Sequence, residues 1–328
     1  MTTGALPENC VKCCLPDRLN DLNINIPVNF FDTPEDFFQY LAGGSYGKVY
    51  KHQDSIGKET VAIKVPFKNH ATLFIEEIEK HKTLAHPHIV HYITAHKCIS
   101  TDKYHIIMEY MENASLEKKL STITCDMNSR TIPVLRTVRS LKYIEHILRA
   151  LVYLHNEMKF IHRDLRAANV LLDANDVAKL ADFGITKCVS ETSSLGNTDA
   201  PSSKVGNHLW CGPEILLDKK EHKGFNEDIW SLGIVILEMV FHQPDFFDAY
   251  GPWIKQTAFI KVHKSGTFGQ EVLKPLLEQI KSSDTRTLLK ECLIDNVPDR
   301  KTSSELLQLV KKIRVQRRPS SPVLPYKL

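Results

Sequence analysis

The chain has 328 residues, enough for two lobes or domains that each bury a core of their own. It is 42% hydrophobic, 25% charged and 8% aromatic, which is the balance of an ordinary globular protein. A formal net charge of +3 is too small to indicate nucleic acid or a membrane surface as a partner. The longest apolar stretch, Ile229 to Phe241, contains Ser231 and Glu238 and is too short to span a bilayer, so it predicts a buried helix.

Residues 1–34 have scattered Pro and Asn and little periodicity, and we interpret them as an N-terminal extension. The extension opens with no secretory signal, and Thr2 stands where myristoylation needs glycine. Cys10, Cys13 and Cys14 form C-x-x-C-C without a nearby fourth ligand for zinc, so we interpret them as free thiols. Eight cysteines in this pattern make no disulfide framework, which favours an intracellular, cytoplasmic location with the nucleus left open.

Between Phe37 and Met111 the apolar runs are short and rich in Val, Ile and Tyr, which predicts strands. One amphipathic helix interrupts them at about residues 71–84. From Leu116 onward the pattern is helical, with a polar insertion over 121–140 ahead of a long amphipathic helix. The tail, 313–328, has basic residues and three prolines. A small strand-rich lobe followed by a larger helical lobe predicts a cleft between the two.

Two motifs in the strand-rich part have chemical significance. In LAGGSYGKVY at 41–50, glycines between two strands allow backbone N–H groups to approach a phosphate chain. The second motif, VAIK, ends at Lys64, which either lies on the surface or points into the cleft and needs a counter-charge there. Glu77 on the amphipathic helix is the candidate, with Glu76 and Glu79 as neighbouring alternatives.

Two further motifs lie in the helical part. In HRDLRAANVLLD at 162–173, Asp164 sits in a loop beside a basic residue and can accept a proton from a hydroxyl group. Asn169, five residues later, can coordinate a cation through its amide oxygen. In LADFG, Asp182 follows a short strand-like run, and Gly184 allows the backbone to turn sharply.

The chain resembles the eukaryotic protein kinases, because the glycine loop, V-A-I-K, H-R-D-L-x-x-x-N and D-F-G occur in the family's order and near its spacing. GPE at 212–214 stands where the family has A-P-E, and DIWSLG at 228–233 matches a helix motif of the family. Arg300 stands where the family's Arg pairs with the Glu of A-P-E.

The resemblance spans about residues 36–312 and implies an α+β, bilobal fold. By this resemblance the domain covers 35–312. Its N-lobe, a small antiparallel sheet with one main helix, covers 35–111, and its larger, mostly helical C-lobe covers 112–312.

The resemblance also implies ATP and Mg²⁺ as cofactors. By resemblance, Lys64 holds the α- and β-phosphates, and Glu77 holds Lys64 in place. Asn169 and Asp182 hold Mg²⁺, while Asp164 orients the attacking hydroxyl and accepts its proton. Positioning and electrostatics do most of the work in such a transfer, so a small set of residues suffices.

The other residues implied for the nucleotide site come from the glycine loop, the strands and the segment between the lobes. They are Ala42, Gly43, Gly44, Gly47, Val49, Ala62, Met108, Glu109, Met111 and Leu171. The adenine is expected between Val49 and Ala62 on one side and Leu171 on the other. Its polar edge is expected to bond the backbone of Glu109 and Met111, with Met108 at the back of the pocket.

The sequence departs from the family pattern at several positions. Ala42 replaces the first loop glycine, for which we expect at most a modest effect on nucleotide binding. His81 and Tyr92 stand where the family has two apolar residues stacked with the Phe of D-F-G. We hypothesise that His81 contacts Tyr92 beside Phe183 and makes the helix position sensitive to protonation; the alternative is that His81 tilts to solvent.

Different motifs of the sequence point to different acceptor hydroxyls, either tyrosine or serine and threonine. Arg166, which we include in the catalytic set, and Trp210 resemble the tyrosine and tyrosine-kinase-like groups. The segment 185–213 contains no tyrosine, however, and DIWSLG resembles the Ser/Thr enzymes. We therefore favour a Ser/Thr protein kinase, with tyrosine or dual specificity as the alternative.

Arg163, beside Asp164, predicts control by phosphorylation, because a phosphate on the following loop would neutralise the guanidinium. Thr198, Ser202 and Ser203 are the candidate sites for an upstream kinase or for the chain itself. The expected partners are these kinases and a protein substrate, with no nucleic acid and no membrane.

Two other classes of function stay open. A pseudokinase would keep the fold as a scaffold or allosteric module, and a small-molecule kinase would use the same fold on another acceptor. Gly212 and Cys211, where the family has Ala and Met, are expected to loosen the segment that cradles a substrate peptide.

Overall fold

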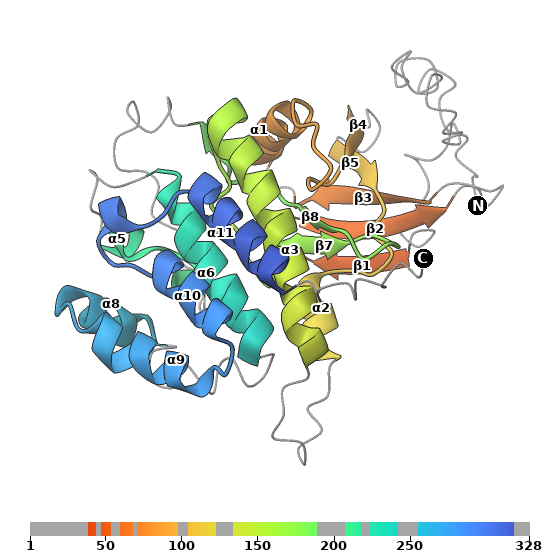
Figure 1. Ribbon diagram of the computed structural model, residues 1–328. Coiled ribbons are helices and arrows are strands. Elements are labelled where there is room, and N and C mark those ends of the chain that lie inside the picture. Colours follow the sequence, from red (N-terminus) through yellow and green to blue (C-terminus); the bar gives the residue numbers. More distant parts are fainter. Residues whose placement is uncertain are drawn as a thin grey trace, which may run out of the picture.

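The structure is a computed structural model of the chain (Figure 1). The residues that it describes are 39–43, 47–53, 60–67, 71–97, 104–122, 134–188, 207–217, 224–241 and 255–317. They form a five-stranded sheet at one end and a larger group of helices at the other (Figure 1). The α+β, bilobal arrangement expected from the sequence is confirmed.

The small lobe is an antiparallel sheet in the order β1-β2-β3-β5-β4. Its strands are β1 (Gln39–Gly43), β2 (Gly47–Gln53), β3 (Thr60–Pro66), β4 (Tyr92–Lys97) and β5 (Tyr104–Glu109). Branched and aromatic side chains are frequent in these strands, and the cross-strand neighbours Tyr50, Ile63 and Ile107 bury one face of the sheet. Helix α1 (Ala71–His81) packs on the other side, near β5.

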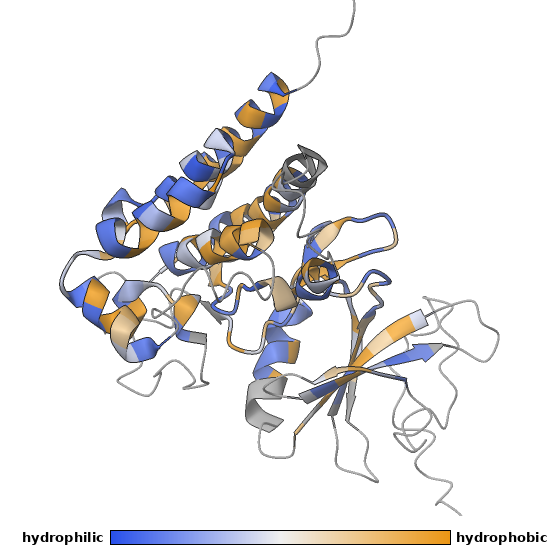
Figure 2. Ribbon diagram, turned by 90° about the horizontal axis from the view of Figure 1, so that it is seen from below, coloured by the Kyte–Doolittle hydropathy of each residue, from blue (hydrophilic) through white to orange (hydrophobic). Residues whose placement is uncertain are grey.

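The large lobe is built around α6 (Asn226–Phe241), in which every residue from 227 to 239 is buried. Around it lie α2 (Leu116–Ser121), α3 (Val134–Val152), α5 (Pro213–Leu216), α8 (Gln256–Lys264), α9 (Lys274–Gln279), α10 (Ser283–Cys292) and α11 (Ser303–Gln316). These outer helices carry hydrophobic and hydrophilic residues on different sides, as Figure 2 shows. Within the described part of the chain, none of the helices combines the length and the hydrophobicity needed to cross a bilayer.

Two short antiparallel strand pairs position the loops between the lobes. Strand β6 (Phe160–Ile161) pairs with β9 (Lys187–Cys188), and β7 (Val170–Leu172) pairs with β8 (Ala178–Leu180). The loop that contains H-R-D therefore runs from β6 to β7, and D-F-G directly follows β8. Because Leu180 exchanges backbone hydrogen bonds with His88 and Val90, β8 also connects the two lobes.

Two element boundaries differ from the sequence-based expectation. Helix α3 begins at Val134, inside the stretch 121–140 that was expected to be a polar insertion. The run just ahead of it, 121–133, is polar and weakly patterned, so composition places the boundary too late. Helix α1 ends at His81, three residues before the predicted end, because Lys82 and Thr83 already form a turn.

Candidate active site

Three charged side chains from different elements meet between the lobes. Lys64 on β3 lies 2.6 Å from Glu77 Oε1 on α1 and 2.9 Å from Asp182 Oδ1 in the loop after β8. Lys64 and Glu77 are buried, and Asp182 is half-buried. The two alternatives to Glu77 lie elsewhere, since Glu76 and Glu79 are exposed on α1.

The charges of this group depend on one another. Burial alone would lower the pKa of Lys64, but the carboxylates of Asp182 and Glu77 outweigh it and raise that pKa above its ordinary value. Burial would likewise raise the pKa of Asp182, yet the ammonium group of Lys64 brings the pKa below its usual range. Lys64 is therefore a permanently charged cation, and Asp182 is a carboxylate at neutral pH.

The loop from β6 to β7 connects Asp164 to Asn169. The Asn169 amide nitrogen donates to the Asp164 carbonyl at 2.8 Å and to Asp164 Oδ2 at 2.9 Å. Burial and the negative charge of Asp182 raise the pKa of Asp164. Because the amide nitrogen of Asn169 is held by Asp164, its amide oxygen is the atom that can coordinate a cation.

The two loops are tied to each other through backbone bonds. The Ala181 N–H donates to the Asn169 carbonyl at 2.9 Å, and His162 Nε2 donates to the Ala181 carbonyl at 3.1 Å. Asp182 has a φ of +66°, a strained conformation that brings its carboxylate back toward Lys64. At Gly184 an added Cβ would lie 3.3 Å from oxygens of both Asp182 and Glu77, so the absence of a side chain lets these acids approach.

Asp228, in the first turn of α6, fixes the backbone of the H-R-D motif through hydrogen bonds. Its carboxylate accepts from the His162 N–H at 2.8 Å, from the Arg163 N–H at 2.9 Å and from His155 Nε2 at 2.8 Å. These bonds hold Arg163 at a φ of +69°. The DIWSLG motif contains this residue, but its spacing gives no indication of which backbone groups the carboxylate binds.

The residues expected around an adenine belong to one hydrophobic cluster. Ala62, Met108 and Met111 are buried in it, and Val49 and Leu171 pack against it. Ala62 pairs with Met108 across β3 and β5. This cluster of apolar side chains lies beside Lys64, since Ala62 and Lys64 belong to the same strand.

The backbone between the lobes defines how an adenine edge can bind. The Glu109 N–H already donates to the His91 carbonyl at 3.0 Å, so a contact at Glu109 must use its own carbonyl oxygen. The Met111 carbonyl accepts from the Ala114 N–H at 3.2 Å, which leaves the Met111 N–H as the donor. One acceptor and one donor match the polar edge of an adenine.

The glycine loop is only partly described. Ala42 and Gly43 are exposed at the end of β1, and Gly47 begins β2. Ala42 pairs with Val49 in the register of the two strands, and its methyl group points to solvent. Gly44 lies outside the described residues.

Arg166 takes part in a contact between the H-R-D loop and the segment before α5. Its guanidinium lies 5.7 Å from the centre of the Trp210 ring, and Trp210 Nε1 donates to Glu238 Oε2 at 3.0 Å. The same oxygen accepts from the Ala167 N–H at 3.1 Å. Nothing in the sequence indicates this role for Glu238, which is there one polar residue in a mostly apolar helix.

The chain matches the protein kinase domain model over residues 37–310. This chain belongs to the protein kinase family. "Mitogen-activated protein kinase kinase kinase 3" of Arabidopsis thaliana is 30% identical over 280 residues, which cover 82% of this chain and 41% of that protein. "Mitogen-activated protein kinase kinase kinase ANP1" of the same organism is 32% identical over 282 residues, covering 82% and 38%. The kinase chain spans less than half the length of these relatives. Membership of the family implies the use of ATP.

His81 of this kinase lies in a stack of rings next to the active site. Its ring centre is 5.6 Å from that of Tyr92 and 5.0 Å from that of Phe183, which in turn lies 5.1 Å from that of His162. His81 Nε2 donates to the Val90 carbonyl at 2.7 Å. The alternative of a solvent-facing His81 is wrong, because the residue is only 2% exposed.

Burial lowers the pKa of His81 to about 4, although the bond to Val90 opposes the shift. His81 is thus neutral in the folded kinase between about pH 5.5 and 8. The predicted contact of His81 with Tyr92 beside Phe183 is confirmed. The sensitivity of the helix position to protonation of His81 stays a prediction.

The low pKa of His81 also predicts acid destabilisation of this kinase. The unfolded chain binds the proton near the ordinary pKa of 6.5, and the folded chain binds it only at about 4. The contribution of His81 to stability is therefore complete above pH 6.5 and falls by up to about 3 kcal/mol as the pH drops toward 4. Urea unfolding at a series of pH values measures this slope. It should be smaller in His81→Leu and unchanged in the control His91→Leu, whose side chain is exposed; equal slopes in all three proteins would contradict the prediction.

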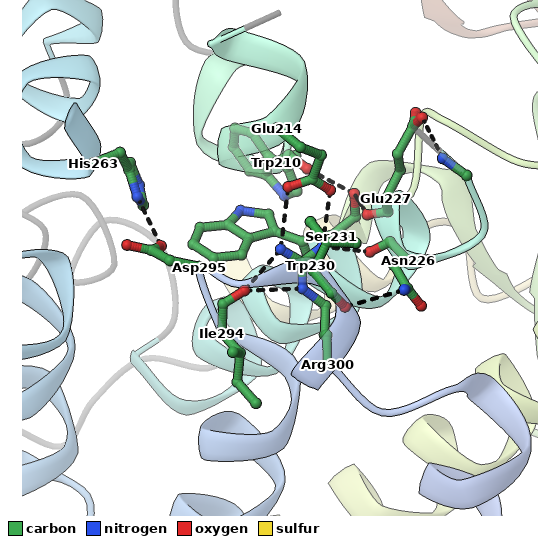
Figure 3. Close-up of polar contacts among 12 residues, drawn as sticks. Trp210, Glu214, Asn226, Glu227, Trp230, Ser231, His263, Ile294, Asp295 and Arg300 are labelled. Atoms are coloured by element: carbon green, nitrogen blue, oxygen red, sulfur yellow. Dashed lines mark hydrogen bonds and ion pairs between the residues drawn. The ribbon is translucent and has the colours of Figure 1, made fainter. Parts of the chain in front are cut away.

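Glu214 of the GPE motif and Arg300 form an ion pair in the large lobe (Figure 3). Arg300 donates to both carboxylate oxygens at 2.9 and 3.1 Å, and both side chains are 0% exposed. A Cβ on Gly212 would lie 2.3–2.5 Å from the Glu214 carboxylate. The packing of Glu214 thus requires a residue without a side chain at position 212. The expectation of a loosened segment stays a prediction. Burial raises the pKa of the Cys211 thiol to about 12, so this cysteine is not ionised at neutral pH.

Restoring the family's alanine at Gly212 is therefore expected to destabilise this kinase. In Gly212→Ala the Glu214 carboxylate must shift although Arg300 fixes both of its oxygens, and the expected loss is about 1–3 kcal/mol, as for overpacked cores. Gly269→Ala is the control, because nothing lies within 4 Å of a Cβ at that position. Denaturant unfolding of both variants measures the difference. A Gly212→Ala variant as stable as Gly269→Ala would contradict the prediction.

Some predicted features lie outside the described residues. They are the three N-terminal cysteines and the candidate phosphorylation sites Thr198, Ser202 and Ser203.

Proposed function

We propose that this chain transfers the γ-phosphate of ATP to a serine or threonine hydroxyl of a protein substrate. The observation that supports it most is the arrangement of Lys64, Glu77 and Asp182 beside the loop that ties Asp164 to Asn169. Both relatives are named mitogen-activated protein kinase kinase kinases, that is, enzymes whose substrate is itself a protein kinase. This supports a protein rather than a small molecule as the acceptor.

Each residue of the proposed site has a distinct task. Lys64, held by Glu77, neutralises phosphate oxygens. Asp164 orients the acceptor hydroxyl and takes its proton, and its raised pKa makes it a better base than an ordinary carboxylate. The oxygens of Asn169 and Asp182 suit Mg²⁺, which when bound offsets charge on the phosphates.

We propose that the kinase domain covers residues 35–312, with lobes at 35–111 and 112–312 and flanking segments at 1–34 and 313–328.

Cys211 and Cys292 are free thiols, which supports a reducing, intracellular place of action.

Regulation is proposed to act through the segment between D-F-G and GPE. Phosphorylation of Thr198, Ser202 or Ser203, by an upstream kinase or by the chain itself, would increase an existing basal activity.

The experiment that tests the function is incubation of the full chain with ATP, Mg²⁺ and casein, followed by mass spectrometry of the modified side chains. Phosphoserine or phosphothreonine is the expected product, and an Asp164→Asn control should yield at most about a hundredth as much in the same time. Phosphotyrosine alone would move the assignment to the tyrosine alternative. Binding of ATP without any transfer would overturn the proposal in favour of a pseudokinase.

A further inference from the structure

Arg163 is the middle residue of the H-R-D motif, between His162 and Asp164, and its side chain is partly buried. Its side chain is 17% exposed, and its φ is +69°. A guanidinium in such a place destabilises the loop conformation unless a negative charge compensates it. The sequence suggested that a phosphate on the 185–213 segment supplies that charge.

The structure supplies a carboxylate at this place. Glu227 Oε2 lies 3.4 Å from Arg163 Nε, and the Glu227 side chain is 8% exposed. Its other oxygen accepts from the Gly224 N–H at 3.1 Å, which fixes the orientation of the carboxylate. Among the described residues, Arg163 makes no other ion pair. Glu227 and Asp228 are thus consecutive acids of α6: Asp228 accepts a hydrogen bond from the Arg163 backbone, and Glu227 forms an ion pair with the Arg163 side chain, whose Nε has no hydrogen-bond partner among the described residues.

The other ionisable groups around Glu227 are acids, so Arg163 is the cation with which it can pair. Glu227 is surrounded by Arg163, the carboxylates of Asp228 and Glu214, and the thiol of Cys211. The Asp228 carboxylate is occupied by His155 and by two backbone N–H groups, and Glu214 is paired with Arg300. Figure 3 shows the Glu227 side chain extending away from the Glu214–Arg300 pair.

We propose that Glu227 is a built-in counter-charge for Arg163, which keeps the catalytic loop in its active conformation without a phosphate on the 185–213 segment. Glu227 is a positioning residue, because it acts on Asp164 through Arg163. The inference rests on the proposed function and deepens it, since it assigns the basal activity to Glu227 and leaves to phosphorylation only the part added to it.

The test uses the full chain treated with phosphatase, its unphosphorylated state verified by intact mass, with ATP, Mg²⁺ and casein at about pH 8. This pH favours the ionised form of Glu227, because burial raises its pKa to about 7 against the opposing effect of Arg163. The unphosphorylated parent is expected to be active. Glu227→Gln, which keeps the shape and the acceptor for Gly224, should lower kcat about tenfold or more with little change in KM for ATP. Glu291→Gln is the matched control, since Glu291 forms a surface ion pair with Lys301 at 3.5 Å.

A double variant separates the charge from a merely structural role. In the Arg163→Met background no counter-charge is needed, so adding Glu227→Gln should change kcat by less than about threefold. If Glu227→Gln alone does not fold, the double variant is still expected to fold and to match Arg163→Met. Equal losses in both backgrounds would overturn the inference, because Glu227 would then act independently of Arg163.

Two further outcomes distinguish a failure of the Glu227 proposal from a failure of the proposed kinase function. A parent that transfers phosphate only after phosphorylation of its own chain overturns the role of Glu227 and leaves the kinase assignment standing. A parent that transfers no phosphate in either state overturns the proposed function, and the inference falls with it.

Discussion

Replacing Asp164 by asparagine is expected to lower kcat for phosphate transfer by about 10²- to 10⁴-fold, the range found for a positioned general base. Asparagine keeps the volume of Asp164 and an oxygen that can accept from the Asn169 amide, so the loop geometry is retained. It loses the group that takes the hydroxyl proton. Because the raised pKa of Asp164 reflects an unfavourable burial of charge, removing that charge should not destabilise the fold.

Initial rates of phosphate transfer to casein, together with a thermal unfolding curve, check this prediction. Asp299→Asn is the matched control, because Asp299 also accepts from an asparagine amide, that of Asn296 at 2.7 Å, but far from the active site on the surface. The control should keep the parental rate. A folded Asp164→Asn variant with more than about a tenth of the parental kcat would show that Asp164 is not the base.

Replacing Arg300 by methionine is expected to lower the free energy of unfolding by about 3–5 kcal/mol, because it leaves the Glu214 carboxylate buried without a partner. This is a large share of the roughly 5–15 kcal/mol of a typical domain. Arg300 also donates to the carbonyls of Asn226 and Ile294 and lies 5.2 Å from the centre of the Trp230 ring, so several elements lose a contact at once.

Denaturant unfolding of Arg300→Met and of its neighbour Lys301→Met measures the difference. Lys301 forms a surface ion pair with Glu291, for which a loss of less than about 1 kcal/mol is expected. If Arg300→Met does not yield folded protein, Arg300→Met with Glu214→Gln removes both charges and should recover part of the stability. Equal stability of Arg300→Met and Lys301→Met would refute the buried-pair argument.

The sequence alone predicted the bilobal α+β fold, since its strand-rich and helix-rich parts differ in period and composition. It also placed Lys64, Asp164, Asn169 and Asp182 in the motifs of the kinase family. Motifs of this kind can be recognised without coordinates, because each needs particular residue types at a fixed spacing along one local segment.

Only the tertiary structure decided which distant groups compensate one another. Glu227 meets Arg163, and Glu238 joins Trp210 to Ala167, because α6 passes beneath the H-R-D loop. The requirement for glycine at position 212 likewise depends on the Glu214 carboxylate, which Arg300 holds from 86 residues away in the chain. The low pKa of His81 likewise follows from its burial, which depends on how segments distant in the sequence pack around it. Charge compensation and steric fit are relations between segments, and no local pattern in a single sequence specifies them.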